Sequence, residues 1–279
     1  MNSLYKLAYR LDPACWVKEV VGQTPLCWQM QFLRAPRGTQ LLALTARQVG
    51  KTTAAAWAIA HQMVHNDNSL SVVACPAQRQ SGEAVRRVRD VLTAAGVDLV
   101  VDNTYGLELK NRSRVLALPG SDDSIRGLSV DGWIIADEAA RLSTDLIAAV
   151  RPMRARFAHS RFAMLSTAWS RTDPFWQAWE SDGDSWIRLQ ATADMPDCPL
   201  TANFLQQERA AFGDDYFKRE YLGIPAGTHT SPFSWELFDR ATCVTPPLVP
   251  RGQALQPHAE MARAAPNPFR SLPASRLFQ

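Results

Sequence analysis

The hydrophobic positions of this chain form short apolar runs that alternate with helical patterns. Several runs are continuously apolar, such as Trp133-Ile-Ile-Ala136, which favours strands covered on both faces. Strands that alternate with helices predict an α/β fold with a mostly parallel sheet and helices on both faces. The predicted strands are Gln40–Leu44, Leu70–Cys75, Val115–Leu118, Gly132–Ala136, Phe162–Ser166 and Trp186–Gln190.

The predicted helices lie between these strands and continue after the last one. Helical patterns cover Lys51–His65, Gln80–Ala95, Thr144–Met153, Asp173–Glu180, Asn203–Phe212 and Asp214–Tyr221. We therefore expect an α/β domain over residues 1–190 and a small helical subdomain or linker over residues 191–243. Residues 244–279 are rich in proline, alanine and arginine and lack apolar periodicity, so we expect a disordered tail there.

Composition and charge exclude several classes of protein. The formal net charge is only +3, so a surface that binds a polyanion would have to be local. The five cysteines form no C-x-x-C pair, which argues against a disulfide framework or a zinc site and favours a reducing cytosol. No signal peptide is evident, and no apolar run approaches the roughly 20 residues of a membrane span. We therefore expect an intracellular, cytoplasmic protein with no membrane partner.

The stretch Thr45-Ala-Arg-Gln-Val-Gly-Lys-Thr52 has the length and the ending of a phosphate-binding loop. It joins a predicted strand to a predicted helix, so backbone N–H groups would face the phosphates of a nucleotide. Lys51 would span the β- and γ-phosphates, and the Thr52 hydroxyl would hold Mg²⁺. The alternative is a chance G-K-T at a helix start. The residues expected to line the nucleotide here are Thr45, Ala46, Gln48, Val49, Gly50, Lys51, Thr52 and Thr53.

Two adjacent carboxylates end the apolar run that begins at Trp133. Asp137 would bind Mg²⁺, and Glu138 would orient and deprotonate an attacking water. The alternative is an acidic first turn of a helix, where carboxylates are favoured. Lys51 upstream favours the catalytic interpretation, and two acids rather than one favour hydrolysis over binding alone.

Two further candidates are weaker on their own. Gln29 offers a donor and an acceptor that suit the edge of adenine, and Trp28 could stack on the ring, although core packing explains Trp28 equally well. Thr167 follows a predicted strand, and its hydroxyl could sense the γ-phosphate or cap the next turn.

Six motifs in this order resemble the ATPase domain of the large terminase subunit of tailed phages. They are P-L-C-W-Q, A-R-Q-V-G-K-T-T, V-V-A-C-P-A-Q-R-Q-S, I-R-G-L-S, I-I-A-D-E-A-A and L-S-T-A, within roughly Leu11 to Ala241. The resemblance implies a RecA/ASCE-like P-loop NTPase with ATP and Mg²⁺ as cofactors. It also implies a motor that drives double-stranded DNA into empty capsids in a bacterial host cell. The implied partners are DNA, the small terminase subunit, the phage portal and further copies in a ring.

The resemblance gives roles to two arginines. Arg47 stands where terminase loops commonly carry an arginine, which would neutralise γ-phosphate charge or hold Glu138 in position. Arg126, eleven residues before Asp137, matches an arginine finger that enters a neighbouring subunit's site; an arginine in an ordinary polar loop is the alternative. Full terminases continue into an RNase H-like nuclease. No strand–acid pattern of that kind follows, so we expect no nuclease activity and a truncated or frameshifted product, or a nuclease on another chain.

Other functions stay open from the sequence. The chain could be a nucleotide-binding remnant of a defective prophage, or another DNA-dependent P-loop translocase. Arg79, Arg86, Arg87 and Arg89 form a basic stripe on one predicted helix, which suits DNA phosphates or simply a solvated face. His61 and His65 lie one helical turn apart without an evident third ligand, so we expect no metal there.

Overall fold

The computed structural model describes residues 3–118, 127–181 and 185–225, all within one compact unit. An eight-stranded sheet runs through this unit in the order β3-β4-β5-β2-β6-β7-β1-β8. The strands are β1 (Gln40–Thr45), β2 (Leu70–Ala74), β3 (Leu99–Asn103), β4 (Gly106–Leu109), β5 (Arg114–Ala117), β6 (Trp133–Asp137), β7 (Arg161–Ser166) and β8 (Trp186–Ala191). Arg126 and the predicted tail, residues 244–279, lie outside the described residues.

The sheet is mostly parallel, as the sequence predicts. Strands β5, β2, β6, β7, β1 and β8 pair in parallel, whereas β3 and β4 add an antiparallel edge. The apolar pattern of the sequence does not predict β3 and β4. Val100 and Val101 of β3 are exposed, and Glu108 separates the buried Leu107 and Leu109 of β4, so this hairpin has no continuous buried apolar run that would mark it.

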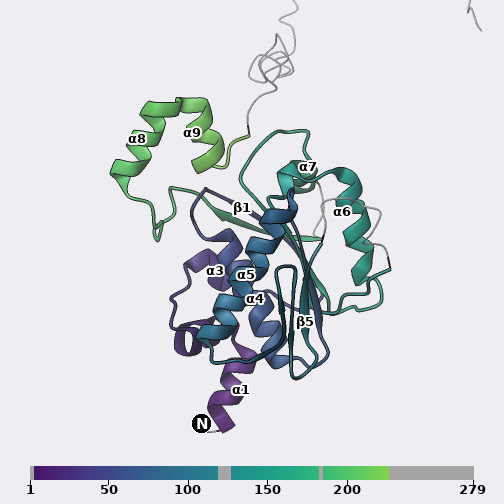
Figure 1. The fold of residues 1–279 in the computed structure, drawn as a ribbon. Coiled ribbons are helices and arrows are strands. Elements are labelled where there is room, and N and C mark those ends of the chain that lie inside the picture. The colour runs from purple at the N-terminus through teal and green to yellow at the C-terminus, as the bar shows by residue number, and fades with distance from the viewer. Residues whose placement is uncertain (1–2, 119–126, 182–184, 226–279) are drawn as a thin grey trace, which may run out of the picture. The chain divides into compact units, whose positions relative to one another are not determined.

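Helices cover both faces of the sheet. Figure 1 shows α3 (Cys27–Leu33), α4 (Lys51–His65) and α5 (Gln78–Ala94) on one side, and α6 (Thr144–Val150) and α7 (Pro174–Glu180) on the other. Side chains of each central strand alternate between the two cores: Leu41 packs on the α4 side and Leu42 on the α6 side. Both faces are buried, which is why the strands are continuously apolar.

Helix α6 is shorter than the predicted Thr144–Met153. It ends at Val150 and continues as a tighter 3₁₀ turn, η4 (Arg151–Arg154). Pro152 lies in this turn and has no N–H for the next α-helical hydrogen bond, which explains the change of helix type.

The chain begins with three helical segments that the sequence analysis did not predict: α1 (Ser3–Leu11), α2 (Pro13–Trp16) and a π-helical turn, η1 (Val17–Val21). They pack against α4 through His61, whose Nε2 lies 2.8 Å from the carbonyl oxygen of Tyr9. Burial lowers the pKa of His61 to about 3. The ring is therefore neutral near pH 7, and Nε2–H donates to this carbonyl. His61 and His65 both contact the edge of Trp16, so each belongs to the packing of this end of the core.

After β8 the chain forms the helical hairpin α8 (Ala202–Phe212) and α9 (Asp214–Tyr221), close to the predicted bounds. The end of the hairpin returns to the segment that follows β8, because Ala193 N donates to the carbonyl oxygen of Tyr221 at 2.8 Å. The predicted domain boundaries at residues 190 and 243 stay predictions. Within the described part of the chain, no helix is both long and apolar enough to cross a bilayer.

Truncating one core ring tests this packing. Phe162 is fully buried on the α6 side of β7, so Phe162→Ala should lower the free energy of unfolding by about 3–5 kcal/mol. Phe212→Ala is the matched control: this ring is 59% exposed and lies tilted against the Tyr216 ring, so its loss should cost at most about 1.5 kcal/mol. Urea denaturation of both variants measures the difference, and equal losses would contradict the assignment of the core.

Candidate functional site

The carboxyl ends of β1, β7 and β6 lie side by side at one edge of the sheet. Strand β7 pairs with both β1 and β6, and all three run in parallel. The loops that follow these strands therefore open on the same side, which is where α/β sheets bind ligands. These loops carry the predicted phosphate-binding loop, Asp137-Glu138 and Thr167.

The phosphate-binding loop turns tightly between β1 and α4. Gln48 and Gly50 have φ values of 61° and 84°, in the left-handed region. Such values favour glycine, and Gly50 occupies the position just before α4. The loop therefore adopts its turn with glycine at only one of the two left-handed positions.

Gln29 holds this loop from the side. Its buried amide nitrogen donates to the carbonyl oxygens of Gly50, at 3.2 Å, and Val49, at 3.5 Å. Its amide oxygen accepts from the backbone N–H of Leu26 at 2.8 Å. Both ends of the side chain are thus engaged, so Gln29 acts here as a brace for the loop. Its predicted contact with adenine stays a prediction.

Trp28 belongs to the hydrophobic core. It is 3% exposed, and its ring packs against Phe32 with the centroids 6.5 Å apart. The structure thus supports core packing, the alternative that the sequence left open, and the buried ring offers no free face to a base.

The side chains of Lys51, Thr52, Asp137 and Glu138 come together at this edge. Lys51 Nζ lies 3.4 Å from Glu138 Oε1. Thr52 Oγ1 donates a hydrogen bond of 2.6 Å to Asp137 Oδ2. Burial raises the pKa of Asp137, and the Lys51 charge and the Thr52 hydrogen bond act in the opposite direction. The predicted lysine, hydroxyl and carboxylates therefore share one site.

The backbone turns sharply at Glu138. Its φ and ψ are 54° and 43°, a left-handed conformation that costs a non-glycine residue about 1–2 kcal/mol. Two hydrogen bonds hold the turn: Glu138 N donates to Asp137 Oδ1 at 3.0 Å, and Arg141 N donates to the Glu138 carbonyl at 2.9 Å. Strain of this kind is concentrated at functional sites, and here the turn carries a carboxylate that contacts Lys51.

The end of β7 is tied to the loop after Glu138. Ser166 Oγ accepts from the backbone N–H of Ala140 at 3.1 Å. The neighbouring Thr167, the predicted site residue, is buried at 3% exposure. Ser166 belongs to the same L-S-T-A motif, but no sequence pattern predicts its contact with Ala140.

The backbone N–H groups of two residues at the start of the loop are hydrogen-bonded outside the loop. The Ala46 N–H donates to the carbonyl of Ala191 at 2.7 Å, and the Arg47 N–H to that of Glu220 at 2.9 Å. Thr45 is 1% exposed, and its hydroxyl has no hydrogen-bond partner among the described residues. These positions extend β1 toward β8 and α9.

The Arg47 guanidinium reaches α9. Its Nη1 donates to the Tyr216 hydroxyl at 2.9 Å, and its Nε lies 3.8 Å from the buried Glu220 carboxylate. Its described contacts do not include Glu138, whose cationic contact is Lys51. No sequence motif predicts Tyr216 or Glu220 as partners of Arg47, because they lie so far along the chain.

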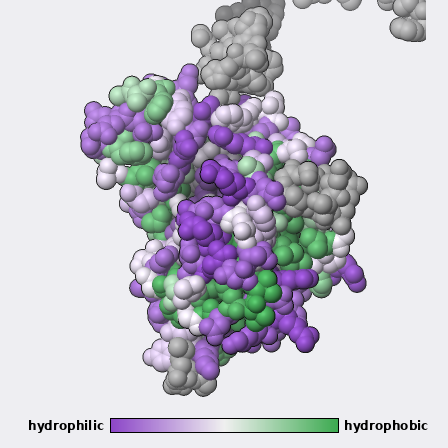
Figure 2. All heavy atoms as spheres, in the orientation of Figure 1, coloured by the Kyte–Doolittle hydropathy of each residue, from purple (hydrophilic) through white to green (hydrophobic). Residues whose placement is uncertain are grey.

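A cavity of about 350 Å³ opens beside Asp137 and Glu138. Figure 2 shows mainly hydrophilic side chains in the middle of this face, above a hydrophobic patch. Burial raises the pKa of the Cys75 thiol to about 12, so Cys75 contributes to the cavity wall without charge. The lining residues are Thr52, Cys75, Arg79, Gln80, Glu83, Arg87, Asp137 and Glu138.

The fold and this edge of the sheet define the class of protein, a RecA-like P-loop fold of the terminase ATPase type. The family follows from the sequence. A family model described as "Terminase large subunit, T4likevirus-type, N-terminal" matches residues 42–240, more than half of the chain. The chain therefore belongs to this family. Among curated proteins, none matches its sequence.

Solved structures show the same fold at low sequence identity. The large terminase ATPase domain of Thermus phage P74-26 is 18% identical, with a TM-score of 0.65 over 76% of this chain and 98% of that one. The HK97 bacteriophage large terminase is 16% identical, with a TM-score of 0.60 over 77% of this chain and 54% of that one. The large terminase of a thermophilic bacteriophage, solved in complex with ADP, is 13% identical, with a TM-score of 0.57 over 77% of this chain and 52% of that one. This chain thus spans about half the length of the last two proteins.

The brace formed by Gln29 can be tested at Gly50. A Cβ on Gly50 would lie 2.6 Å from the Gln29 amide nitrogen, and φ is already left-handed. Gly50→Ala should therefore lower the free energy of unfolding by more than the roughly 1–2 kcal/mol of left-handed strain alone. Gly96→Ala is the control, because it has φ +67° and nothing within 4 Å of its Cβ.

Chemical denaturation of the four combinations of Gly50→Ala and Gln29→Ala completes this test. In the Gln29→Ala background the cost of Gly50→Ala should approach that of Gly96→Ala, because the clashing amide is gone. An unchanged cost would show that Gln29 does not press on the loop.

Proposed function

We propose that this chain is a Mg²⁺-dependent ATPase that powers the movement of double-stranded DNA into phage capsids. The observation that carries the proposal is the convergence of Lys51 with Glu138, at 3.4 Å, and of Thr52 with Asp137, at 2.6 Å. Membership of the terminase large subunit family supports it. The similar terminase of the thermophilic bacteriophage has been solved in complex with ADP and with ATP-gamma-S, which supports a nucleotide as the ligand.

The residues of the loop would bind the triphosphate. The turn at Gln48–Gly50 and the first turn of α4 direct backbone N–H groups to the ligand, and the positive end of the helix dipole favours its negative charge. Lys51 would move from Glu138 to the β- and γ-phosphates. Binding would thus replace one partner of the lysine with a more highly charged one.

Thr52 and Asp137 fit a divalent cation. A hydroxyl and a carboxylate oxygen lie 2.6 Å apart, and both are hard oxygen donors of the kind that Mg²⁺ prefers. When bound, Mg²⁺ would neutralise part of the negative charge of the phosphates. The buried position of Asp137 keeps its carboxylate fixed at the end of β6.

Glu138 would act as the general base. Once Lys51 has turned to the phosphates, a carboxylate oxygen of Glu138 is free to accept a proton from water. The water oxygen then forms a bond to the γ-phosphorus as the bond to the β–γ bridging oxygen breaks, which yields ADP and inorganic phosphate. The two hydrogen bonds that hold the backbone turn at Glu138 limit the freedom of the base.

Arg47 would assist from the loop. Its side chain is half exposed, and it reaches Tyr216 and Glu220 in the structure described here. Contact with the γ-phosphate, as proposed from the sequence, would require release of these two partners. Glu220 would then keep Arg219, whose Nε lies 3.1 Å from its Oε1.

We further propose that Arg126 acts as an arginine finger between neighbouring copies of the chain in a ring. The proposed partners are double-stranded DNA, the small terminase subunit and the phage portal, in the cytoplasm of a bacterial host. Thr167 would sense the γ-phosphate, and Gln29 would contact adenine in addition to bracing the loop.

Two substitutions test the ATPase. Lys51→Ala should abolish nucleotide binding and turnover, because the cation between the phosphates is gone. Glu138→Gln should still bind ATP but turn it over at least about 100-fold more slowly, since the general base is lost. Steady-state phosphate release with and without duplex DNA, with fluorescent-nucleotide titration, measures both effects.

The control for this experiment is Glu180→Gln, which removes an exposed carboxylate at the end of α7 and should leave turnover unchanged. Binding without turnover in the unsubstituted chain would instead support a nucleotide-binding remnant. Turnover that survives in Glu138→Gln would contradict the assignment of the base.

Mixing experiments test Arg126. Arg126→Ala and Glu138→Gln should each be inactive alone. A mixture should recover part of the DNA-stimulated ATPase activity, because some interfaces then combine an intact finger with an intact base. Each variant alone at the same total concentration is the control, and a mixture no more active than its components would count against a role between subunits.

A further inference from the structure

The cavity beside Asp137 and Glu138 has two chemically different walls. One wall is formed by Thr52 and the two carboxylates, and the other by side chains of α5: Arg79, Gln80, Glu83 and Arg87. Its volume of about 350 Å³ lies at the lower end of the range of small-ligand pockets, about 300–1,000 Å³. The cavity therefore has room for a phosphate group next to the proposed catalytic base.

The α5 wall carries positive charge that its own acid does not neutralise. Glu83 is bound by Arg86, whose Nε donates to Oε2 at 2.8 Å, and this hydrogen bond lowers the pKa of Glu83. Arg87 Nε is 4.0 Å from Glu83 Oε1, the outer limit of an ion pair. Arg79 makes no hydrogen bond or ion pair with any residue in the described ranges. The charges of Arg79 and Arg87 also lower the pKa of Glu83, but its close hydrogen bonds go to Arg86, so three guanidinium groups share one carboxylate and the wall keeps a net positive charge.

Contacts outside the cavity hold this wall against α4. Arg87 Nη1 lies 3.5 Å from the Thr53 hydroxyl, next to Thr52. Gln80 Oε1 accepts from the Ala77 N–H at 3.2 Å and so caps the start of α5. The start of α5 is therefore capped, and Arg87, farther along the same helix, contacts the first turn of α4.

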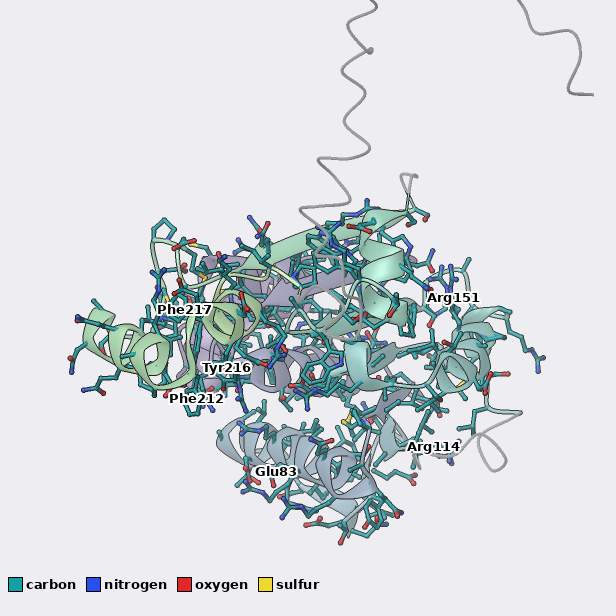
Figure 3. The ribbon with its side chains drawn as sticks, turned by 90° about the horizontal axis from the view of Figure 1, so that it is seen from above. Glu83, Arg114, Arg151, Phe212, Tyr216 and Phe217 are labelled. Carbon is teal, nitrogen blue, oxygen red and sulfur yellow. The ribbon has the colours of Figure 1, made fainter. Side chains whose placement is uncertain are left out.

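The four arginines of the predicted basic stripe differ in their surroundings: two form ion pairs outside the cavity and two line it. Arg86 pairs with Glu83 and Asp90, and Arg89 Nε lies 2.6 Å from Asp102 Oδ1. Only Arg79 and Arg87 line the cavity. Figure 3 shows Glu83 on α5 and Tyr216 on the α8–α9 hairpin. Tyr216 and Glu220, which contact Arg47, are not among the residues that line the cavity. This division favours a compact anion in the cavity over a DNA backbone laid along the helix.

The geometry points to a phosphate subsite in which Arg79 and Arg87 bind the γ-phosphoryl group of ATP and the inorganic phosphate cleaved from it. The inference rests on the proposed ATPase function and deepens it. Guanidinium groups suit this ligand because they present several N–H donors to phosphate oxygens. Opposite Thr52 and Asp137, they would hold the group that leaves while ADP stays on the loop.

Nucleotide discrimination tests the subsite. Fluorescence titration of Arg79→Ala and Arg87→Ala should show about tenfold weaker binding of ATP-gamma-S for each, the loss of one charge-assisted hydrogen bond. ADP has no γ-phosphoryl group, so its affinity should be unchanged. Arg79→Lys should retain part of the ATP-gamma-S affinity. Lys110→Ala is the charge control: it removes an exposed cation paired with Asp98, and should alter neither affinity.

Inhibition by inorganic phosphate in the presence of ADP separates the two sources of the ligand. If the variants lose only ATP-gamma-S affinity, the subsite holds the γ-phosphoryl group of the bound nucleotide. If inhibition by inorganic phosphate is also weaker, the subsite holds the cleaved phosphate too. Equal losses for ADP and ATP-gamma-S would overturn the subsite. Weaker duplex-DNA binding in Arg79→Ala and Arg89→Ala, with ATP-gamma-S binding unchanged, would overturn it in favour of a DNA contact.

The failures of the two proposals are distinguishable. If the unsubstituted chain binds neither ADP nor ATP-gamma-S, the ATPase proposal falls and the subsite falls with it. The unsubstituted chain could instead bind and hydrolyse ATP while the arginine variants keep its ratio of ADP affinity to ATP-gamma-S affinity. That result would contradict the subsite and leave the ATPase proposal intact.

Discussion

The hydrogen bond from Thr52 to Asp137 joins the two halves of the site. Thr52 begins α4 after β1, and Asp137 ends β6, so the bond fixes the first turn of a helix against a strand two positions away in the sheet. Asp137 is buried, and a buried carboxylate is costly unless it is hydrogen-bonded or paired. The register of β1, β7 and β6 must therefore bring these two residues together, and Lys51 and Glu138 follow because they are their neighbours in sequence.

The sequence is enough to predict site residues whose positions depend on local backbone structure. Lys51 and Thr52 stand in a loop whose spacing is set by backbone geometry, and Asp137 follows a strand marked by a continuous apolar run. The parallel order of the central strands follows from the alternation of strands and helices. These features depend on residues within about one turn or one strand of each other, which is why pattern alone predicts them.

Features that depend on distant contacts could not be predicted in this way. The pairing of Arg47 with Tyr216 joins residues 169 positions apart, and no motif marks the second of them. Gln29 could be selected as a polar residue near the loop, but only packing reveals that both ends of its amide are engaged. Arg79, Arg86, Arg87 and Arg89 look alike along the helix, and their separation into cavity and surface groups depends on where Asp90 and Asp102 lie.

The ion pair between Lys51 and Glu138 has a consequence for which ligands the loop admits. In the structure described here the lysine already has an anionic partner at 3.4 Å, so an incoming anion competes with a tethered carboxylate of high local concentration. Weakly charged metabolites would lose that competition, whereas a polyphosphate would win it. The same displacement would leave Glu138 without its cation, so phosphate binding and the release of the proposed general base would be one event.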